Sequence, residues 1–201
     1  NRIYGLLGKN GMGKSTLLYL IAGLLRPKNG NVCVDGMESK DRRPEMLREI
    51  YVVPEEYNLP NLTLKQYVKV HQDFYPRFSE EILMNCLRDF EMQADVNFKH
   101  LSMGQKKKIY MSFAVASCCQ LLLMDEPTNG LDIPSKALFR KVIAGNLPAD
   151  SSLIISTHQV HDVEQLLDHV FILNNSEMII DASVEEIAKQ YEFTYRNANE
   201  M

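Results

Sequence analysis

An eight-residue stretch near the start of the chain, Gly8 to Ser15, constrains the fold more than any other feature. It reads GKNGMGKS and matches the pattern G-x-x-x-x-G-K-[ST]. An apolar run at residues 3–7 precedes it, and a helical pattern at residues 15–25 follows it. In this setting glycines let backbone amides turn inward around phosphate oxygens, and the helix N-terminus adds positive potential. The stretch therefore predicts an α/β fold built around a phosphate-binding loop.

The same pattern gives individual side chains a chemical role. We expect Lys14 to reach the β and γ phosphates of a nucleotide, and the Ser15 hydroxyl to ligate Mg²⁺. The other nucleotide contacts expected from the loop and the first helical turn are Gly8, Asn10, Gly11, Gly13 and Thr16. The alternative interpretation of the motif by itself is a glycine-rich turn with an exposed lysine.

Short β-type runs alternate with helical patterns along the chain, which is typical of a mostly parallel sheet covered by helices. The runs lie at residues 3–7, 32–34, 50–53, 121–124, 153–156 and 170–173. Two of them, LLLM and LIIS, are apolar without alternation, so we expect them at the centre of the sheet. A hairpin of residues 171–173 with 178–180, and a last helix over residues 184–191, complete the pattern.

Between residues 60 and 116 the strand pattern gives way to helical periodicity. Helices are predicted over residues 63–74, 79–90 and 102–116, and Ser79 followed by two glutamates is typical of a helix start. We therefore expect one domain over residues 1–201. Its P-loop core would comprise about 1–59 and 117–201, with an inserted α-helical subdomain at about 60–116.

Charge and hydropathy exclude several classes of protein. The net charge of −4 and the pI of about 5.8 provide no electrostatic footprint for nucleic acid. The longest strongly apolar stretch, residues 17–25, is too short to span a bilayer. The four cysteines show no CxxC spacing, so reduced thiols are expected. For the adjacent pair Cys118-Cys119, a place in the core before a buried strand is favoured over redox sensing.

A second chemical signal lies at the end of the apolar run 121–124, where Asp125 and Glu126 follow directly. In a P-loop fold, Asp125 at this place would hold Mg²⁺ through water. Glu126 beside it would polarise the water that attacks the γ-phosphate. Alone this pattern is weak, and the phosphate-binding loop gives it weight.

A third signal is the stretch Leu101-Ser102-Met103-Gly104-Gln105, which precedes the helix leading into the acidic strand. It resembles LSGGQ, the signature of ATP-binding cassette (ABC) ATPases, with Met103 in place of the commoner glycine. The resemblance implies the ABC ATPase fold with ATP and Mg²⁺ as cofactors. It also implies a head-to-tail pair of cassettes, in which one chain's signature covers the γ-phosphate bound by the other. An ordinary serine-capped helix is the alternative.

Other family elements occur in the family's order. Asp132 resembles the D-loop aspartate, and His158 resembles the switch histidine that contacts the γ-phosphate. Glu55 occupies the place of the Q-loop, where the family usually has glutamine. A metal pair of His158 and His161 lacks a third ligand. The run 106–108, all lysine, is read as a solvated helix face rather than a nucleic-acid contact.

The resemblance implies the ATP-hydrolysing subunit of a transporter, of the bacterial exporter type. Its partners would be a second cassette, in a homodimer or heterodimer, and separate membrane-spanning subunits at the cytoplasmic face of a membrane. Nucleic acid is not expected. The alternatives are a soluble ABC switch acting on ribosomes or DNA, and a small-molecule kinase. The first strands of the domain, with the adenine-stacking aromatic residue, are expected upstream of this chain, because Tyr4 is a poor substitute.

Overall fold

A six-stranded sheet forms the centre of the protein, and the computed structural model describes residues 2–190. The strand order is β4-β5-β6-β1-β7-β8, and every neighbouring pair is parallel except the antiparallel pair β7 and β8. The strands are β1 (Arg2–Leu7), β4 (Ile50–Val53), β5 (Leu121–Asp125), β6 (Ser152–Thr157), β7 (His169–Asn174) and β8 (Glu177–Ser183). The predicted α/β class with a mostly parallel sheet is confirmed.

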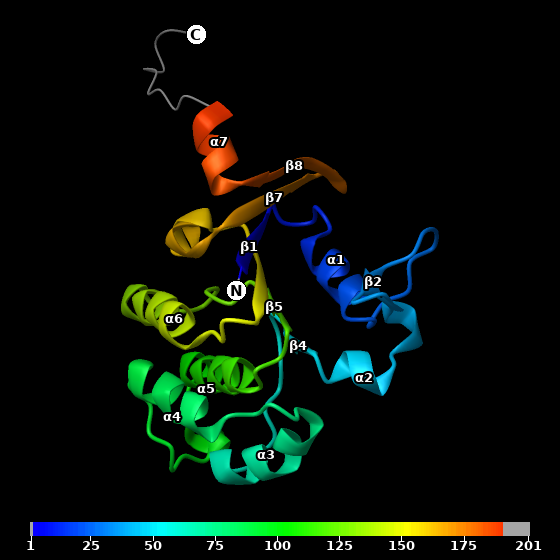
Figure 1. Cartoon of the computed structure of the whole chain (residues 1–201). Coiled ribbons are helices and arrows are strands. Elements are labelled where there is room, and N and C mark those ends of the chain that lie inside the picture. Colours follow the sequence, from blue (N-terminus) through cyan, green and yellow to red (C-terminus); the bar gives the residue numbers. More distant parts are fainter. Residues whose placement is uncertain (1, 191–201) are drawn as a thin grey trace, which may run out of the picture.

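Helices cover both faces of this sheet, with α1 on one side and α5 and α6 on the other (Figure 1). The α-helices are α1 (Lys14–Ile21), α2 (Pro44–Leu47), α3 (Leu64–His71), α4 (Glu80–Asp89), α5 (Met103–Ala116), α6 (Ile133–Asn146) and α7 (Val184–Gln190). Short 3₁₀ turns are η1 (Ser39–Asp41), η2 (Gln72–Phe74), η3 (Phe98–His100), η4 (Val160–Asp162) and η5 (Glu164–Leu166). Within residues 2–190, none of these helices combines the length and the apolar character needed to cross a bilayer.

The unbroken apolar run of β5 is explained by burial on both sides. Leu122 and Met124 belong to the core formed with α5 and α6, whereas Leu123 between them belongs to the core formed with α1. Successive side chains of a strand point to opposite faces, so a strand covered on both faces needs apolar residues at every position. The predicted interior position of β5 and β6 follows.

The strand register brings three loops to one edge of the sheet. Leu7 at the end of β1 is paired with Thr157 at the end of β6, and Asp125 at the end of β5 is paired with Ser156. The carboxyl ends of β1, β5 and β6 therefore lie together. Ligands of open parallel sheets bind outside these carboxyl ends, so this edge is the place to look for a site.

Three helices, α3, α4 and α5, lie between β4 and β5 in the chain. The residues predicted to begin them, Thr63, Ser79 and Ser102, are their N-caps, and each side chain accepts a backbone N–H three residues on. Phe113 of α5 joins them to the sheet, because its ring lies 5.9 Å from Tyr51 of β4 and 5.1 Å from Tyr67 of α3. The helices α3 and α5 are thus anchored on β4 through aromatic rings.

The first helix is shorter than predicted. It was expected to reach residue 25, but α1 ends at Ile21. Gly23 adopts a left-handed φ of 67°, and the N–H groups of Leu24 and Leu25 donate to the carbonyl of Tyr19. Glycine at this place is a common helix stop because a left-handed residue costs it little. A Cβ on Gly23 would also lie 2.1 Å from the carbonyl oxygen of Ser39.

The run at residues 32–34 is not part of the main sheet, so that prediction is wrong. Its residues form β2 (Cys33–Val34), which pairs with β3 (Met37–Glu38) in a separate antiparallel hairpin. The two residues between them, Asp35 and Gly36, both have positive φ, of 49° and 76°. This is the geometry of a tight hairpin turn, which Asp-Gly favours.

At the C-terminal end the predicted hairpin is confirmed as β7 and β8, followed by α7. The last predicted helical residue, Tyr191, lies outside the described residues. Cys118 and Cys119 are buried directly before β5, as the core interpretation of that pair predicts.

Candidate functional site

The loop between β1 and α1 has a backbone path that requires glycine at both ends. Gly13, the N-cap of α1, has a left-handed φ of 97°. At the other end, a Cβ on Gly8 would lie 2.6 Å from the carbonyl oxygen of Leu173 in β7. Since glycine alone tolerates both the positive φ and the close approach, the loop follows a course set by its own sequence.

Lys14 is buried under this loop, with 5% of its surface exposed. Its Nζ donates to the carbonyl oxygens of Gly8 at 2.9 Å and Lys9 at 3.3 Å. The same atom lies 3.5 Å from Oε1 of Glu126, which follows β5. The ammonium group is therefore held between the loop and a carboxylate on the next-but-one strand of the sheet.

A cleft of about 400 Å³ opens over the loop. Its lining residues are Asn10, Gly11, Gly13, Lys14, Ser15, Thr16, Glu55 and Glu126. Three separate sequence predictions, the phosphate-binding loop, the residue in the Q-loop position and the glutamate after the acidic strand, thus meet in one cavity. Gly8 contributes its carbonyl oxygen to Lys14.

The two carboxylates at the end of β5 are held by the neighbouring strand β6. The Ser156 hydroxyl donates to Oδ1 of Asp125, which is 1% exposed. The Thr157 hydroxyl donates to Oε2 of Glu126 at 3.1 Å. Because β6 lies between β1 and β5, its hydroxyls fix both acids relative to the loop.

His158 faces the same glutamate. Its backbone N–H donates to Oε1 of Glu126 at 3.1 Å, and its Nδ1 lies 2.9 Å from that oxygen. Its ring remains about a third exposed, whereas Glu126 is nearly buried. A histidine in this place can orient the carboxylate and still meet a ligand. Within residues 2–190, no group of three metal-binding side chains includes His158 or His161.

Glu55 reaches the cleft from the end of β4. Its Oε1 accepts a hydrogen bond from Nδ2 of Asn129 at 2.8 Å, so it is tied to the loop after β5. Tyr19 of α1 lies in the same field: burial raises its pKa, and the charges of Asp125 and Glu55 raise it further. Tyr19 falls one helical turn after Ser15, and it is not one of the residues that line the cleft.

The signature stretch lies on the surface, at the start of α5. Ser102 caps the helix: its Oγ accepts the Gln105 N–H at 3.2 Å, and Oε1 of Gln105 accepts the Ser102 N–H at 3.0 Å. Such reciprocal bonding is a capping box. Ser102 and Gln105 are exposed, and Met103 is 66% exposed. The stretch is therefore presented to the outside of the chain.

The signature and the residue in the D-loop position share a second hollow, of about 470 Å³. Its lining residues are Ser102, Gly104, Gln105, Lys108, Gly130, Leu131, Asp132 and Ser135. Asp132 caps α6, and its Oδ1 accepts the Ser135 N–H at 2.9 Å. The hydrogen bonds from Ser135 lower the pKa of Asp132. This hollow has no lining residue in common with the cleft over the phosphate-binding loop.

Comparison with known proteins agrees with these features. Residues 1–129 match a family model described as ABC transporter. The chain belongs to the ABC transporter family. It is 27% identical over 191 residues to the ABC transporter ATP-binding protein YtrB of Bacillus subtilis, covering 94% of this chain and 65% of YtrB. It is 28% identical to the Nod factor export ATP-binding protein I of Cupriavidus metallidurans, covering 92% of this chain and 63% of that protein.

This chain spans just under two thirds of the length of each of these two relatives. A solved structure, titled as that of an ATP binding subunit of an ABC transporter, superposes with a TM-score of 0.81 at 26% identity. That match covers 94% of this chain and 81% of the other. The ABC ATPase fold expected from the sequence is thereby confirmed.

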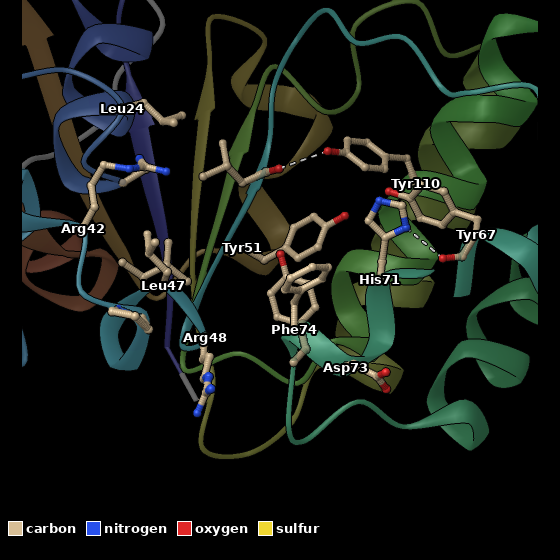
Figure 2. Close-up of a pocket in the computed structure, with 15 residues that line it drawn as sticks. Leu24, Arg42, Leu47, Arg48, Tyr51, Tyr67, His71, Asp73, Phe74 and Tyr110 are labelled. Atoms are coloured by element: carbon tan, nitrogen blue, oxygen red, sulfur yellow. Dashed lines mark hydrogen bonds between the residues drawn. The ribbon is translucent and has the colours of Figure 1, made fainter. Parts of the chain in front are cut away.

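A groove of about 600 Å³ lies on this ABC domain between β4, α2 and α3 (Figure 2). On one wall stand Tyr51, Tyr67, Tyr110 and His71, and across from them lie Leu24, Arg42, Leu47 and Arg48. Leu24 and Phe74, at its rim, are 54% and 63% exposed. The groove combines an apolar floor with two arginines.

His71 and His169, which belong to none of the motifs, each have a polar partner. Nδ1 of His71 lies 2.8 Å from the carbonyl oxygen of Tyr67, and its ring stacks on that tyrosine. Nε2 of His169 lies 2.7 Å from Oδ1 of Asp181 on the neighbouring strand. Sequence separation hides the second pair, because it depends on the register of the β7–β8 hairpin.

Proposed function

We propose that this chain binds ATP with Mg²⁺ in the cleft over the phosphate-binding loop and hydrolyses it, to power a transporter. The observation that carries the proposal is the meeting of Lys14, Glu126 and His158 in one place. A cation, a carboxylate and a histidine lie at the carboxyl edge of the sheet, beside a loop whose amides suit phosphate. Charge stabilisation and water activation, the two needs of phosphoryl transfer to water, are both available there.

In hydrolysis, an oxygen of water forms a bond to the γ-phosphorus while the bond from that phosphorus to the β–γ bridging oxygen breaks. Glu126 is proposed to accept the proton of the attacking water. Both of its oxygens accept hydrogen bonds, Oε2 from the Thr157 hydroxyl and Oε1 from the His158 N–H, so the protein itself fixes its orientation. Lys14 and the loop amides would stabilise the charge on the transferred group.

The residues at this site fit a magnesium ion. Ser15 lines the cleft, and the Asp125 carboxylate is held at the end of β5 by Ser156. Hydroxyl and carboxylate oxygens are the hard donors that Mg²⁺ prefers, usually with several waters retained. When bound, the ion would neutralise charge on the phosphates. Ser15 and Asp125 are the side chains proposed to hold it.

A second copy, or a related cassette, is proposed to complete the site. The signature residues face outward, and their hollow is separate from the cleft of the same chain. Ser102 at the N-terminus of α5 offers a hydroxyl where the helix dipole favours an anion. In a head-to-tail pair, Ser102 and the Gly104 amide of one chain would contact the γ-phosphate held by the other, with Asp132 beside that junction.

The transport partner is proposed to be a membrane-spanning subunit, so that this chain works at the cytoplasmic face of a membrane. Relatives carry names such as SkfA peptide export ATP-binding protein SkfE of Bacillus subtilis and bacitracin transport ATP-binding protein BcrA of Bacillus licheniformis. These names favour export over a switch on ribosomes or DNA. The groove with Arg42 and Arg48 is the proposed contact, for an apolar cytoplasmic segment of that subunit that carries an acidic side chain.

The proposal is tested by ATP hydrolysis as a function of protein concentration. If two chains form the site, specific activity rises with concentration and levels off once the dimer dominates. Copurification of a membrane protein, lost when Arg42 and Arg48 are both changed to Glu, tests the partner. Absence of magnesium-dependent hydrolysis at any concentration contradicts the enzymatic proposal. Hydrolysis stimulated by nucleic acid would instead favour the switch.

A further inference from the structure

Lys107, on α5, carries a buried charge to which none of the motifs assigns a role. It is 6% exposed, while Lys106 and Lys108 on either side are half-buried. The interpretation of this lysine run as a solvated face is therefore wrong for its middle residue. Lys107 precedes the buried residues Met111 and Val115 by four and eight positions. Residues with that spacing share one face of a helix, so Lys107 lies on the buried stripe of α5.

The buried ammonium group binds one short loop. Its Nζ donates to the carbonyl oxygen of Glu126 at 3.0 Å and to that of Asn129 at 2.8 Å. Both carbonyls belong to the connection between β5 and α6. The Glu126 carbonyl also accepts the Asn129 N–H at 3.1 Å. Lys107 thus closes the loop from the side of α5.

The residue it holds has an unusual backbone. Glu126 has a φ of 43°, in the left-handed region that side-chain-bearing residues seldom adopt. Such a conformation persists where the surroundings over-determine it, and it is concentrated at functional sites. Here the Glu126 N–H donates to the Ser156 carbonyl at 3.0 Å, and its C=O accepts from Lys107. Both peptide groups of the glutamate are fixed.

The charge around Lys107 fits a functional role better than a purely structural one. Burial lowers the pKa of Lys107, and the carboxylates of Glu55, Glu126 and Asp125 oppose that shift. A buried cation is costly unless it is paired and hydrogen-bonded. An apolar side chain would complete the stripe of α5 without that cost. An apolar side chain there would not form the two hydrogen bonds to the Glu126 and Asn129 carbonyls.

We propose that Lys107 is a positioning residue, whose ammonium group holds the β5–α6 loop so that the Glu126 carboxylate stays against His158. The inference rests on the proposed hydrolysis, in which Glu126 accepts the proton. Lys107 does not line the cleft, so it acts through Glu126 rather than on the nucleotide. Because it lies on the helix that begins at the signature, it also ties α5 to the loop that carries the glutamate.

The main test compares Lys107→Met with Lys106→Met, which removes a neighbouring charge from the same helix. We expect Lys107→Met to lower kcat by about 10²-fold, the size of loss that follows from displacing a catalytic group by about 1 Å. The KM for ATP should stay within about twofold, because the contacts with ATP are unchanged. Lys107→Arg, which keeps the charge and several donors, should recover most of the loss. Lys106→Met should resemble the unmodified protein.

A double-mutant cycle shows whether Lys107 acts through Glu126. In a Glu126→Gln background, adding Lys107→Met should lower the residual hydrolysis no further, because coupled residues are not additive. A kcat for Lys107→Met close to that of the unmodified protein overturns the inference. A full additional loss in the Glu126→Gln background overturns it as well. If Lys107→Met does not fold, Lys107→Gln, with its shorter reach, supplies the comparison.

Amide exchange at Asn129 tests the grip without reference to hydrolysis. Its N–H donates to the Glu126 carbonyl that Lys107 also binds. Its exchange should become about tenfold faster in Lys107→Met and stay unchanged in Lys106→Met, because local opening controls such rates. Equal exchange in all three proteins would overturn the inference. A protein that hydrolyses no ATP but shows the exchange difference would overturn the proposed function and leave the grip established.

Discussion

The cleft over the phosphate-binding loop and the hollow beside the signature differ in how their side chains are held. In the cleft, Lys14 and Glu126 are each 5% exposed and contact residues far away in the chain: Lys14 lies 3.5 Å from Glu126, and Glu126 accepts a hydrogen bond from Thr157. In the hollow, Ser102 and Gln105 are exposed and bind each other across three residues. One region is fixed by the sheet, and the other by the end of a single helix.

This difference separates two kinds of requirement. A group that must be oriented to within a fraction of an ångström needs support from a second layer of the protein. A group that must meet a ligand carried by another molecule needs exposure. The cleft meets the first requirement, and the signature hollow meets the second. Substitutions in the cleft should therefore impair turnover, and substitutions in the hollow should impair cooperation between chains. The following experiments test this difference.

The largest effect is expected in the cleft, from Glu126→Gln. Turnover should fall by about 10³-fold, within the range contributed by a general base. ATP binding should remain, and an ATP-bound dimer should accumulate, since the amide keeps the shape of the carboxylate. Single-turnover hydrolysis and light scattering with ATP measure both results. Unchanged turnover would remove Glu126 from the proton-accepting role.

A smaller effect, of about 10²-fold on cooperative hydrolysis, is expected from Ser102→Arg in the signature hollow. The Kd for ATP of the single chain should stay within about twofold, because Ser102 does not line that chain's own cleft. Thr63→Arg is a matched control: Thr63 and Gln66 form the same capping box at the start of α3. Loss of ATP binding by the Ser102→Arg monomer would contradict a role in the partner's site.

The smallest effect concerns the core behind both regions. Burial raises the pKa of the Cys86 and Cys119 thiols to about 12, from a reference of 9.0. Above pH 9 the unfolded chain releases these protons and the folded chain keeps them. Stability is therefore complete below pH 9 and falls between pH 9 and 12, by about 1.4 kcal/mol per thiol at pH 10.

Urea unfolding at pH 8 and pH 10 measures this loss. Cys86→Ala should reduce the difference between the two pH values, while Cys33→Ala, which removes an exposed thiol, should not. The same alkaline loss is expected in Glu126→Gln and Ser102→Arg, because both regions rest on this core. If the alkaline loss of stability disappeared in either variant, the substituted region would be coupled to the core, and the two regions could not be compared independently.

The sequence predicts the sheet well wherever burial dictates composition. The runs that became β5 and β6 are apolar because both of their faces are covered, and no other element of that length needs such a composition. The hairpin at Cys33 was misassigned because a three-residue β-run, at residues 32–34, carries little information. The decisive signal was Asp35-Gly36 after it, whose turn geometry closes the strand on its own neighbour.

The site was predictable in its motifs and not in its supports. Lys14, Glu126 and His158 occur in recognisable patterns. The structure places Lys14 within ion-pair distance of Glu126, and His158 within hydrogen-bond distance of it. The support from Lys107 depends on a contact across 19 positions, and it was hidden inside a run of lysines. Its helical spacing from Met111 was the available signal. Lys107 was predicted to be solvated because a run of three lysines is usually exposed, and its helical spacing from the buried Met111 was given too little weight.

The capping box at the signature has a consequence for what that surface can recognise. The Ser102 Oγ accepts the Gln105 N–H through one lone pair, and the hydroxyl has one hydrogen that it can donate. That hydrogen can be offered outward, at a helix end where positive potential gathers. The surface is thus polarised toward electron-rich oxygen and against ammonium groups. By charge alone, this surface would favour a nucleotide's terminal oxyanion over a cationic or purely apolar ligand.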